Sequence, residues 1–572
     1  LLGHGTVETP VMEKKPAGPS YEARQWLGLA LFMVATTATF LTASDYGIAS
    51  DVGNYFYSSL RQIAWLRDLW VLLLEGRPEA ALTTEAVSEH WRWYIERIPH
   101  PPLSRELGGL GWLAMGRFLD PLTAYRTAVM LTFGALTASV GVYTASRTRS
   151  MGAGIAAGLS MLAIPAVFAH GHLAHTDLFL AAFWFWCVTA LDTALRKGGS
   201  GWFLLAGLFL GAAVATKFTG LLLAPVLAVW LATHRGGVSA LLALLLAAVL
   251  VFVAVNPVMW VDPMQGLEDY FLAGVGRGAN LDTRIVTLYF GELYTFRPPW
   301  HYPYVWTAIV LPLPLLAAVL AGLFAPRSGG VRGLVLLNMG VLYGALALPS
   351  TPMHDGIRLF LPLFPFYAVL AGAGVLAVGE WLVDLLSRRF EDMAARRDLI
   401  VAVTIIVLLT LPLFRTVQSH PHQLSYFNAL VGGTRGAQAR GLEVTNLKEV
   451  LNRAALEDLK PMIPSGSVVD AGFMVEEICF YQAVGWAPSG WRIEVPLVNR
   501  DGTADVSLSC EGPESFVTTA LDRPADPADF ILVLNRPAQW RPLELALSES
   551  GGPPMYEISS QGVPLLRLYR AR

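Results

Sequence analysis

Long apolar segments separated by short polar connections dominate the first 415 residues of the chain. A membrane helix needs about 20 mostly apolar residues to cross a hydrocarbon core of about 30 Å. A window of that length selects eleven segments, at approximately residues 26–44, 123–146, 151–169, 176–194, 201–216, 218–233, 238–256, 304–324, 331–349, 358–386 and 399–415. The pattern therefore predicts a polytopic α-helical membrane protein with about eleven transmembrane helices.

The composition agrees with a membrane protein, since 54% of the 572 residues are hydrophobic and only 15% are charged. One soluble core would not bury that much apolar surface. The formal net charge of −3 gives no basic surplus, so we expect no nucleic-acid partner. The three cysteines, Cys187, Cys479 and Cys510, lack the spacing of a zinc or iron–sulfur site, which argues against redox chemistry.

Positive charges in the short connections predict the orientation of the helices. Lysine and arginine concentrate in alternate loops, at residues 147, 149, 196, 197, 235, 327, 332, 388, 389, 396 and 397. Such loops lie on the cytoplasmic side of a membrane. The N-terminal segment, which carries Lys14, Lys15 and Arg24, is expected on the same side. An odd number of spans then places the C-terminal part of the chain outside the cytoplasm.

This topology divides the chain into three parts. They are a cytoplasmic segment 1–25, a transmembrane domain 26–415 with a large first outer loop at 45–122, and an outer domain 416–572. Within the outer loop, residues 56–70 and 91–98 have apolar positions at helical spacing opposite charged ones. These two stretches are predicted to be helices that lie on the membrane surface, where tryptophan and arginine suit the headgroup zone.

The outer domain is predicted to be an α/β domain. Asn446 and Glu449 have the spacing of a capping box, which predicts that a helix starts there. Runs of alternating or continuous apolar residues predict four strands, at 468–473, 491–498, 530–534 and 565–569. Cys479 and Cys510 both fall in this domain and could form a disulfide in an oxidising compartment.

Candidate chemical groups lie in the outer connections. Asp51 follows the first span, where partial desolvation could suit its carboxylate to proton abstraction. The alternative is a helix N-cap or a solvated loop residue, and Asp45 is a rival on the same loop. His100 and two prolines precede Arg105, so that a helix start and a cation form a candidate phosphate site. The alternative for Arg105 is a side chain that snorkels to the membrane surface.

The densest group of ligand-type side chains is at the start of the fourth span. His170, His172 and His175 precede Asp177 there and could bind a metal, although their spacing matches no specific zinc motif. An acid at the start of a span is either an N-cap or the second carboxylate of an outer active site. Asp177 is therefore a candidate catalytic residue.

Two cations on the outer side need an explanation. Lys217 lies between two spans with almost no loop, and it either pairs with a functional group or snorkels to the surface. Asp355 and Arg358 lie together at the outer start of the tenth span, where Arg358 could hold a phosphate or pair with Asp355. Aromatic and arginine residues in loop 257–303 suit sugar binding, but they also fit an ordinary aromatic belt.

Read in order along the chain, four of these motifs resemble one family. They are Asp51 after the first span, His100-Pro101-Pro102 before Arg105, His172-Leu173-Ala174-His175-Thr176-Asp177, and Ala215-Thr216-Lys217-Phe218-Thr219-Gly220. The family is the polyprenyl-phosphate-dependent membrane glycosyltransferases, which include bacterial relatives of protein O-mannosyltransferases and of the lipid A aminoarabinose transferase. Residues 354–362 and 421–428 also resemble bacterial members, and the likeness covers roughly residues 26–435.

The resemblance implies the C-type glycosyltransferase fold in a bacterial inner membrane, and it implies roles for several residues. Asp51 would be the catalytic base, and Asp177 would be a second acid near the acceptor. Arg105 and Lys217 would hold the lipid phosphate, with Arg358 as a further phosphate ligand. Candidates for contacts with the acceptor or the sugar are His100, His172, His175 and Asp355.

The implied reaction is the inverting transfer of a sugar, hexosyl or pentosyl, from a polyprenyl-phosphate donor to an acceptor hydroxyl on the outer face. The expected partners are that donor, membrane lipids, and an acceptor of protein, lipid or glycan nature. No nucleotide is required, because the sugar arrives on a lipid, and a divalent metal could assist.

Two positions depart from the family pattern. Members commonly have Asp-Glu where this chain has Asp51-Val52, and often Lys where it has Arg105. The first departure leaves open a changed acceptor, or a non-catalytic membrane subunit of a larger assembly. The second keeps the charge. A transporter is a third class, but it would place charges at mid-membrane and show paired half-repeats, whereas here the charges cluster at the outer ends of the spans.

Overall fold

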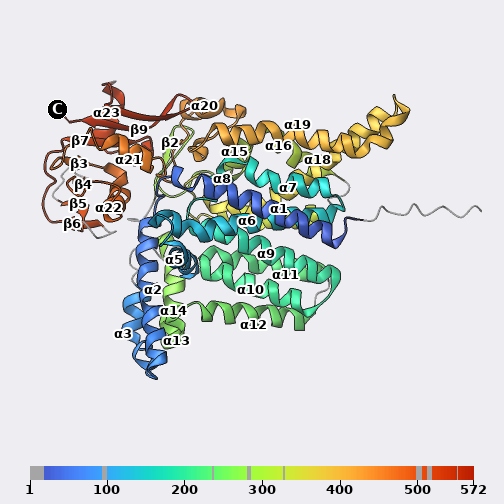
Figure 1. Ribbon diagram of the computed structural model, residues 1–572, viewed down its shortest axis with the longest axis horizontal. Helices are drawn as coiled ribbons and strands as arrows, with labels where there is room; N and C mark the ends of the chain where they lie inside the picture. The colour runs from blue at the N-terminus through green and yellow to red at the C-terminus, as the bar shows by residue number, and fades with distance from the viewer. Residues whose placement is uncertain are drawn as a thin grey trace, which may run out of the picture.

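The computed structural model describes residues 18–92, 100–234, 237–279, 285–325, 329–497, 506–511, 518–550 and 552–571. Helices of the first two thirds of the chain run side by side in a bundle, and the strands gather at one end of it (Figure 1). The chain enters the bundle at the opposite end. The predicted fold class is thus confirmed: a mostly helical chain with several long apolar helices and a C-terminal domain that contains strands.

Each of the eleven apolar segments is mainly helical in the structure. The helices are α1 (Tyr21–Leu41), α6 (Pro121–Thr148), α7 (Met151–Ala163), α8 (Pro165–His170), α9 (Thr176–Lys197), α10 (Ser200–Thr216), α11 (Leu223–Thr233), α12 (Val238–Ala254), α15 (Tyr302–Val310), α16 (Leu313–Phe324), α17 (Gly329–Ala347), α18 (Phe364–Ser387) and α19 (Arg397–Gln418).

Fewer than eleven of these helices are long enough to cross a membrane unaided. Among the described residues, five helical stretches are long and apolar enough to cross a membrane: those of α6, α9, α17, α18 and α19. A sixth is the pair α15 and α16, which bends by 119°. Leu311 is extended at the bend because the residue before a proline, here Pro312, avoids helical geometry. The apolar helices α7, α10, α11 and α12 fall below the length limit.

Small residues let the helices of the bundle approach closely. Gly322 of α16 faces α18, where a Cβ atom at this position would lie 1.9 Å from the carbonyl oxygen of Leu370. A Cβ atom on Gly374 of α18 would lie 1.8 Å from the carbonyl oxygen of Ala318 in α16. Without a hydrophobic driving force between helices in lipid, such backbone contact is a main source of association. Larger side chains at these two glycines would push α16 and α18 apart.

Two long loops form a layer across one end of the bundle, which we call the outer layer because the sequence predicts these loops on the outer side. The first contains α2 (Val52–Leu74), α3 (Thr84–Val87) and α5 (Leu103–Met115), and the second contains α13 (Val258–Val261) and α14 (Pro263–Ala279). Figure 1 shows α2, α3, α13 and α14 running across the direction of the bundle helices. The guanidinium of Arg92 joins the two loops by donating to Asp269 at 2.8 Å. The predicted helix at 56–70 is confirmed, whereas residues 93–99 of the second predicted helix lie outside the described residues.

The C-terminal domain is built on a seven-stranded sheet in the order β6-β5-β4-β3-β7-β9-β8. Its strands are β3 (Val468–Asp470), β4 (Arg492–Leu497), β5 (Val506–Cys510), β6 (Thr518–Leu521), β7 (Phe530–Leu534), β8 (Tyr556–Ser560) and β9 (Val563–Arg570). The central β3 is parallel to β4 and β7, and the other neighbours are antiparallel. The helices of this domain are α20 (Gly433–Ala439), α21 (Arg453–Leu459), α22 (Val475–Ala483) and α23 (Pro542–Ser550). All four predicted strands are confirmed, although β3 is shorter than expected.

The helix predicted to start at Asn446 is wrong. The helix begins at Arg453 instead, and the side chain of Asn452 caps it by accepting from the Ala455 amide at 2.9 Å. Residues 441–452 are irregular because tertiary contacts use their backbone. Glu449 accepts a hydrogen bond from the Gly47 amide at 2.9 Å, through its carbonyl oxygen, and Lys448 has a left-handed φ of 66°.

A separate two-stranded hairpin links the outer layer to the C-terminal domain. Strands β1 (Thr287–Tyr289) and β2 (Glu292–Tyr294) pair in antiparallel fashion, and the Gly291 amide at their turn donates to Gly441 at 3.0 Å. The side chain of Gln539 donates to Val286 at 3.2 Å. The C-terminal domain is therefore attached to the outer layer at several places.

Cys479 of α22 and Cys510 of β5 form a disulfide, with their Cα atoms 5.3 Å apart. We predict that maleimide labels only Cys187 in the denatured, unreduced protein and labels all three cysteines after reduction. Intact-mass measurement counts the labels, and a Cys187→Ala variant should show none before reduction. Three labels without reduction would contradict the disulfide.

Candidate active site

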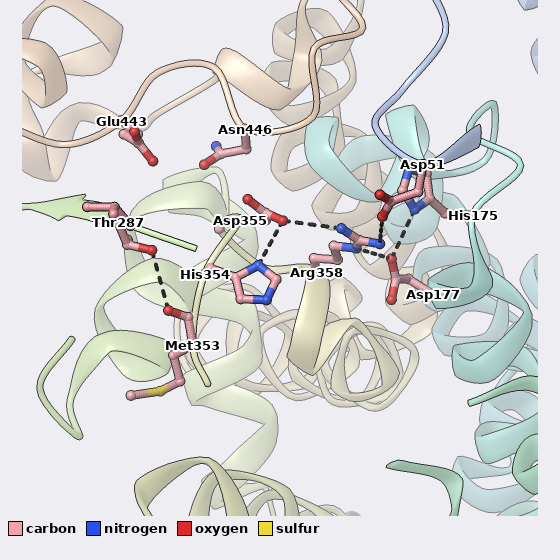
Figure 2. Close-up of polar contacts among 12 residues, drawn as sticks. Asp51, His175, Asp177, Thr287, Met353, His354, Asp355, Arg358, Glu443 and Asn446 are labelled. Carbon is pink, nitrogen blue, oxygen red and sulfur yellow. Dashed lines mark hydrogen bonds and ion pairs between the residues drawn. The ribbon is translucent and has the colours of Figure 1, made fainter. Parts of the chain in front are cut away.

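One guanidinium group, that of Arg358, contacts three carboxylates (Figure 2). Its Nε donates to Asp177 at 2.8 Å, its Nη1 donates to Asp355 at 3.2 Å, and its Nη2 donates to Asp51 at 3.1 Å. Arg358 begins a short 3₁₀ helix before α18, Asp177 lies in the first turn of α9, and Asp51 directly precedes α2. The fold thus unites three acids from separate connections at one cation, and we call these four residues the Arg358 cluster.

Asp177 is held by a second cation. Nζ of Lys217 donates to Asp177 at 2.6 Å, and both side chains are buried. Lys217 follows the last residue of α10, where it ends the helix in an extended conformation. Because its charge meets a buried carboxylate, Lys217 does not snorkel to the membrane surface. Nδ1 of His175 lies 3.6 Å from the same carboxylate.

The C-terminal domain supplies a further cation to the cluster. Arg536, two residues after β7, donates to Asp355 at 2.6 Å through Nη2 and to the carbonyl oxygen of Asn446 at 2.5 Å through Nη1. His354 lies 2.8 Å from the other oxygen of Asp355. Burial would raise the pKa of Asp355, but the charges of His354, Arg536 and Arg358 hold that pKa well below its usual value. The Asp355 carboxylate therefore stays ionised.

Sequence reasoning missed Arg536. A single arginine after an apolar strand has no motif around it, and only the fold brings it to Asp355. The available signal was its position: Arg536 follows Phe530–Leu534, a strand in which every residue is buried. An arginine so close to a fully buried strand end has few routes to water, so a buried partner was a reasonable expectation.

Asp51 is the most accessible acid of the cluster. Its side chain is 35% exposed, compared with 1% for Asp177 and 4% for Asp355. It occupies the N-cap position of α2, as the alternative interpretation proposed, but its side chain makes no capping hydrogen bond there. Its φ is 67°, a left-handed value that costs energy for a residue other than glycine. The backbone is thus fixed in an unusual conformation that turns the carboxylate toward Arg358.

The loop that carries Asp51 is clamped from two sides. On the bundle side, the buried guanidinium of Arg126 in α6 donates to three carbonyl oxygens of this loop, those of Ala43, Tyr46 and Gly47. On the other side, the amide of Ile48 donates to the phenolic oxygen of Tyr481 in α22 at 2.7 Å.

Backbone contacts with residues 447–451 complete the clamp. The Ser50 amide donates to Leu447 at 2.8 Å, next to the bond between Gly47 and Glu449. A Cβ atom on Gly47 would lie 2.3 Å from the carbonyl oxygen of Leu451, so only glycine fits between the two segments. The position of Asp51 therefore depends on the C-terminal domain.

Arg105 is held by the loop that carries His100, whose ring lies near Tyr55. It is fully buried, and its Nη2 donates to the carbonyl oxygen of His100 at 2.9 Å. The ring of Tyr55, one turn after Asp51, lies 6.4 Å from the ring of His100 and 6.0 Å from that of His175. The snorkelling alternative for Arg105 is wrong, because the side chain points into the protein and not toward its surface.

His172 is separated from the other candidates by its contacts. Its ring stacks on Tyr46 with centroids 4.2 Å apart, its Nδ1 lies 3.0 Å from the Phe168 carbonyl, and its Nε2 lies 2.8 Å from the Thr42 hydroxyl. Burial lowers the pKa of His172 to about 3, so the ring is neutral. Both ring nitrogens are thus used within the protein.

The structure offers no obvious metal site in the part of the chain that it describes. There, no three or more His, Cys, Asp or Glu side chains form a group that could hold a metal ion. The three histidines before α9 are buried but differ in their surroundings. His175 faces Asp177 and Tyr55, whereas His172 stacks on Tyr46.

Buried carboxylates also line the contact with the C-terminal domain. Burial raises the pKa of Glu449 to about 7, and the charge of Arg536 offsets this only in part. Glu443, which lies 3.9 Å from Nε of Arg536, also has a pKa raised by burial to about 7. Both carboxyl groups therefore keep their protons to a higher pH than an exposed glutamate does. The sequence pattern assigned Glu449 to a helix cap and did not single out Glu443.

Comparison with known proteins supports the resemblance found in the sequence. Residues 112–260 match the family model described as dolichyl-phosphate-mannose-protein mannosyltransferase. This match confirms, for that part of the chain, the likeness to polyprenyl-phosphate-dependent membrane glycosyltransferases. The matched segment contains Asp177 and Lys217, whereas Asp51 and Arg358 lie outside it. No curated protein matches the sequence significantly.

Two solved structures are similar to the whole chain. They are crystal structures of ArnT from Cupriavidus metallidurans, one bound to undecaprenyl phosphate and one in the apo state. Each has 15% sequence identity and a TM-score of 0.47, over 96% of this chain and 98% of the other.

Arg536→Gln should loosen the Arg358 cluster from outside the bundle. Removing one partner of a buried ion pair commonly costs about 3–5 kcal/mol, because the other charge stays buried. We expect a lower thermal midpoint and faster hydrogen–deuterium exchange in residues 351–358. Arg541→Gln is the matched control, since Arg541 pairs with Asp470 and Glu544 within the C-terminal domain. Equal exchange in residues 351–358 in both variants would contradict the coupling.

Glu449→Gln should change how stability depends on pH. The folded pKa of about 7 exceeds the ordinary value of 4.5, so the folded state binds more protons than the unfolded state between these values. Stability is therefore lost as the pH rises through this window. We expect Glu449→Gln to gain about 2–4 kcal/mol relative to wild type between pH 4.5 and pH 8.

Thermal unfolding across this pH range measures the effect. Glu457→Gln is the control, because the Glu457 side chain is 55% exposed on the nearby α21. A parallel shift at all pH values would contradict the assignment to Glu449.

Proposed function

We propose that the chain is an inverting glycosyltransferase that moves a sugar from a polyprenyl-phosphate donor to an acceptor hydroxyl on the outer membrane face. The observation that carries the proposal is the Arg358 cluster with one accessible acid, Asp51. The family match of residues 112–260 supports the donor class, since the family is described by a dolichyl-phosphate sugar. The transferred sugar would be a hexosyl or pentosyl group.

Asp51 would act as the general base. Its carboxylate is partly exposed, so an acceptor hydroxyl can reach it, while Arg358 fixes its orientation at 3.1 Å. Asp51 takes the proton of the hydroxyl, and the acceptor oxygen forms a bond to the anomeric carbon of the sugar. The bond between that carbon and the phosphate oxygen breaks, and its electron pair leaves with the polyprenyl phosphate. Attack from the opposite side inverts the configuration.

Arg105, Lys217 and Arg358 would stabilise the leaving phosphate. Preorganised cations serve where negative charge develops, and one such donor is commonly worth about 10²–10³ in rate. Glu106, next to Arg105, adds little negative charge, because burial raises its pKa to about 8. The three negative charges of the Arg358 cluster, on Asp51, Asp177 and Asp355, are matched in number by three positive charges. These belong to Arg358 itself and to its neighbours Lys217 and Arg536. Arg105 would supply a further positive charge for the phosphate.

Asp177 and the histidines would serve substrate orientation. Asp177 is held by both Lys217 and Arg358, which makes it a weak base and a good fixed acceptor for a hydroxyl. Neither ring nitrogen of His175 hydrogen-bonds to a described residue, and burial lowers the pKa of His175 to about 3. A neutral ring of this kind can donate to and accept from sugar hydroxyls. His100 and Asp355 would line the same space.

The proposed location is the bacterial inner membrane, with the C-terminal domain outside the cytoplasm. The alternate loops rich in arginine and lysine favour this orientation. The disulfide between Cys479 and Cys510 supports it, because disulfides persist in oxidising compartments. The sugar would then be transferred outside the cytoplasm, where nucleotide sugars are absent and a lipid-linked donor is needed.

The second candidate function is a non-catalytic membrane subunit. Val52, at the position where relatives commonly have an acid, is buried with 2% exposure. An apolar side chain packed there leaves Asp51 as the sole acid of the usual pair at these two positions. If both acids are needed for transfer, the scaffold would bind its lipid without turning it over.

Asp51→Asn should abolish sugar transfer while leaving folding intact. Loss of a general base typically costs about 10²–10⁴ in rate, and amide and carboxylate have similar volumes. Mass spectrometry of lipids and glycans from deletion, wild-type and variant cells measures the outcome. We expect accumulated polyprenyl-phosphate sugar and one underglycosylated product in both the deletion and the Asp51→Asn cells.

Asp45→Asn is the matched control on the same loop, since Asp45 pairs with His420 and is 45% exposed. It should keep transfer at the wild-type rate. A normal profile in Asp51→Asn cells would remove Asp51 as the base. A normal profile in the deletion strain would favour the non-catalytic subunit.

A further inference from the structure

A cavity lies far from the Arg358 cluster, between the helices α1, α6, α9 and α10. Its volume is about 680 Å³, within the range of about 300–1,000 Å³ that is common for small-molecule sites. Tyr21 and Arg24 of α1, Arg196 and Lys197 of α9, and Trp202 of α10 surround one end of it. These residues belong to the first turns of α1 and α10 and the last turn of α9. The cavity therefore opens at the bundle end where α1 begins.

The distance to the cluster excludes a shared ligand headgroup. Asp177 lies in the first turn of α9, and Arg196 lies near its end, 19 residues later. At about 1.5 Å per residue the two lie about 28 Å apart along the helix, nearly the thickness of a hydrocarbon core. A phosphate at the cluster and a phosphate at this cavity would thus lie at opposite membrane surfaces.

The mouth of the cavity carries excess positive charge. Among its described lining residues are Arg24, Arg196 and Lys197, and no aspartate or glutamate. Behind it, Asp192 is shared, since Arg196 donates to it at 2.9 Å and Arg147 lies 3.6 Å from it. One carboxylate thus faces two arginines, and the charges of Arg24 and Lys197 come in addition. An anion would complete this arrangement.

The wall below the cations is mainly apolar. Its apolar lining residues include Gly28, Leu29, Ala135, Val142, Leu205 and Phe209. Hydroxyl and amide side chains also line it, at Gln25, Ser139, Ser146, Thr189 and Thr193, and the Ser139 hydroxyl accepts a hydrogen bond from the indole nitrogen of Trp186 at 2.8 Å. Leu29 is 51% exposed, so the groove opens toward the surface of the bundle that faces lipid. Tyr21 and Trp202 at the rim suit the membrane interface.

We propose that this cavity binds one anionic glycerophospholipid of the cytoplasmic leaflet. Its phosphate would lie among Arg24, Arg196 and Lys197, and the upper part of its acyl chains would lie along Leu29, Val142 and Leu205. The cytoplasmic leaflet carries the anionic lipids that attract such cations. A free phosphate would use the cations but would leave the apolar wall exposed. The inference rests on the proposed membrane orientation but not on the proposed sugar transfer.

Native mass spectrometry of the delipidated, full-length protein tests this proposal. Phosphatidylglycerol and phosphatidylcholine are titrated separately, and wild type should bind the first more tightly. Each cation near an anionic headgroup is worth about fivefold in affinity, so Arg24→Gln with Lys197→Gln should weaken phosphatidylglycerol binding about 10- to 30-fold. Phosphatidylcholine binding should change less.

Two further variants keep the result interpretable. Arg388→Gln with Arg389→Gln removes two exposed charges after α18 at the same bundle end, outside the cavity, and should keep wild-type affinity. Ala135→Trp fills the apolar wall, leaves the cations in place, and should weaken the binding of both lipids. Thermal unfolding checks that each variant is folded.

Three outcomes would overturn the proposal. The first is equal affinity of wild type for the two lipids. The second is an equal loss in the control variant at 388 and 389. The third is displacement of phosphatidylglycerol by inorganic phosphate, which would identify a site for a free anion and not for a lipid.

Discussion

The arrangement of the bundle end next to the C-terminal domain depends on one guanidinium group with three carboxylates around it. Arg358 contacts Asp51, Asp177 and Asp355, which come from three connections far apart in the sequence. Buried charges are expensive unless they are paired and hydrogen-bonded. The bundle, the outer layer and the C-terminal domain must therefore be in register for these charges to be balanced. The need to balance these buried charges therefore limits how far the three parts can shift relative to one another.

The C-terminal domain takes part in this balance. Arg536 contacts the oxygen of Asp355 that does not contact Arg358, and residues 447–451 hold the loop of Asp51 by backbone hydrogen bonds. These contacts leave little conformational freedom for Asp51, the acid that we propose as the base. The left-handed conformation of Asp51 fits this picture, because surrounding structure must hold a strained residue in place.

The sequence predicted the parts of the fold that follow local patterns. Apolar runs identified every helical segment of the bundle, and Phe530–Leu534 was identified as a strand because its residues are continuously apolar. The candidate residues Asp51, Asp177, Lys217, Asp355 and Arg358 do meet in the structure. The helix at Asn446 failed because its backbone serves the Asp51 loop, a contact 400 residues away in the chain that no local signal encodes. For the same reason Arg536 was missed, and Glu449 was assigned to a helix cap and not to a buried contact.

The position of Arg536 near the end of the chain has a consequence for biosynthesis. A chain emerges with its N-terminal part first, and its domains form in that order. Asp51, Asp177 and Arg358 are therefore made well before residue 536. Asp355 receives its last counter-charge only when the C-terminal domain has folded and packed against the bundle. A nascent or truncated chain would thus hold the bundle with an unbalanced carboxylate at Asp355, and completion of synthesis would itself complete the Arg358 cluster.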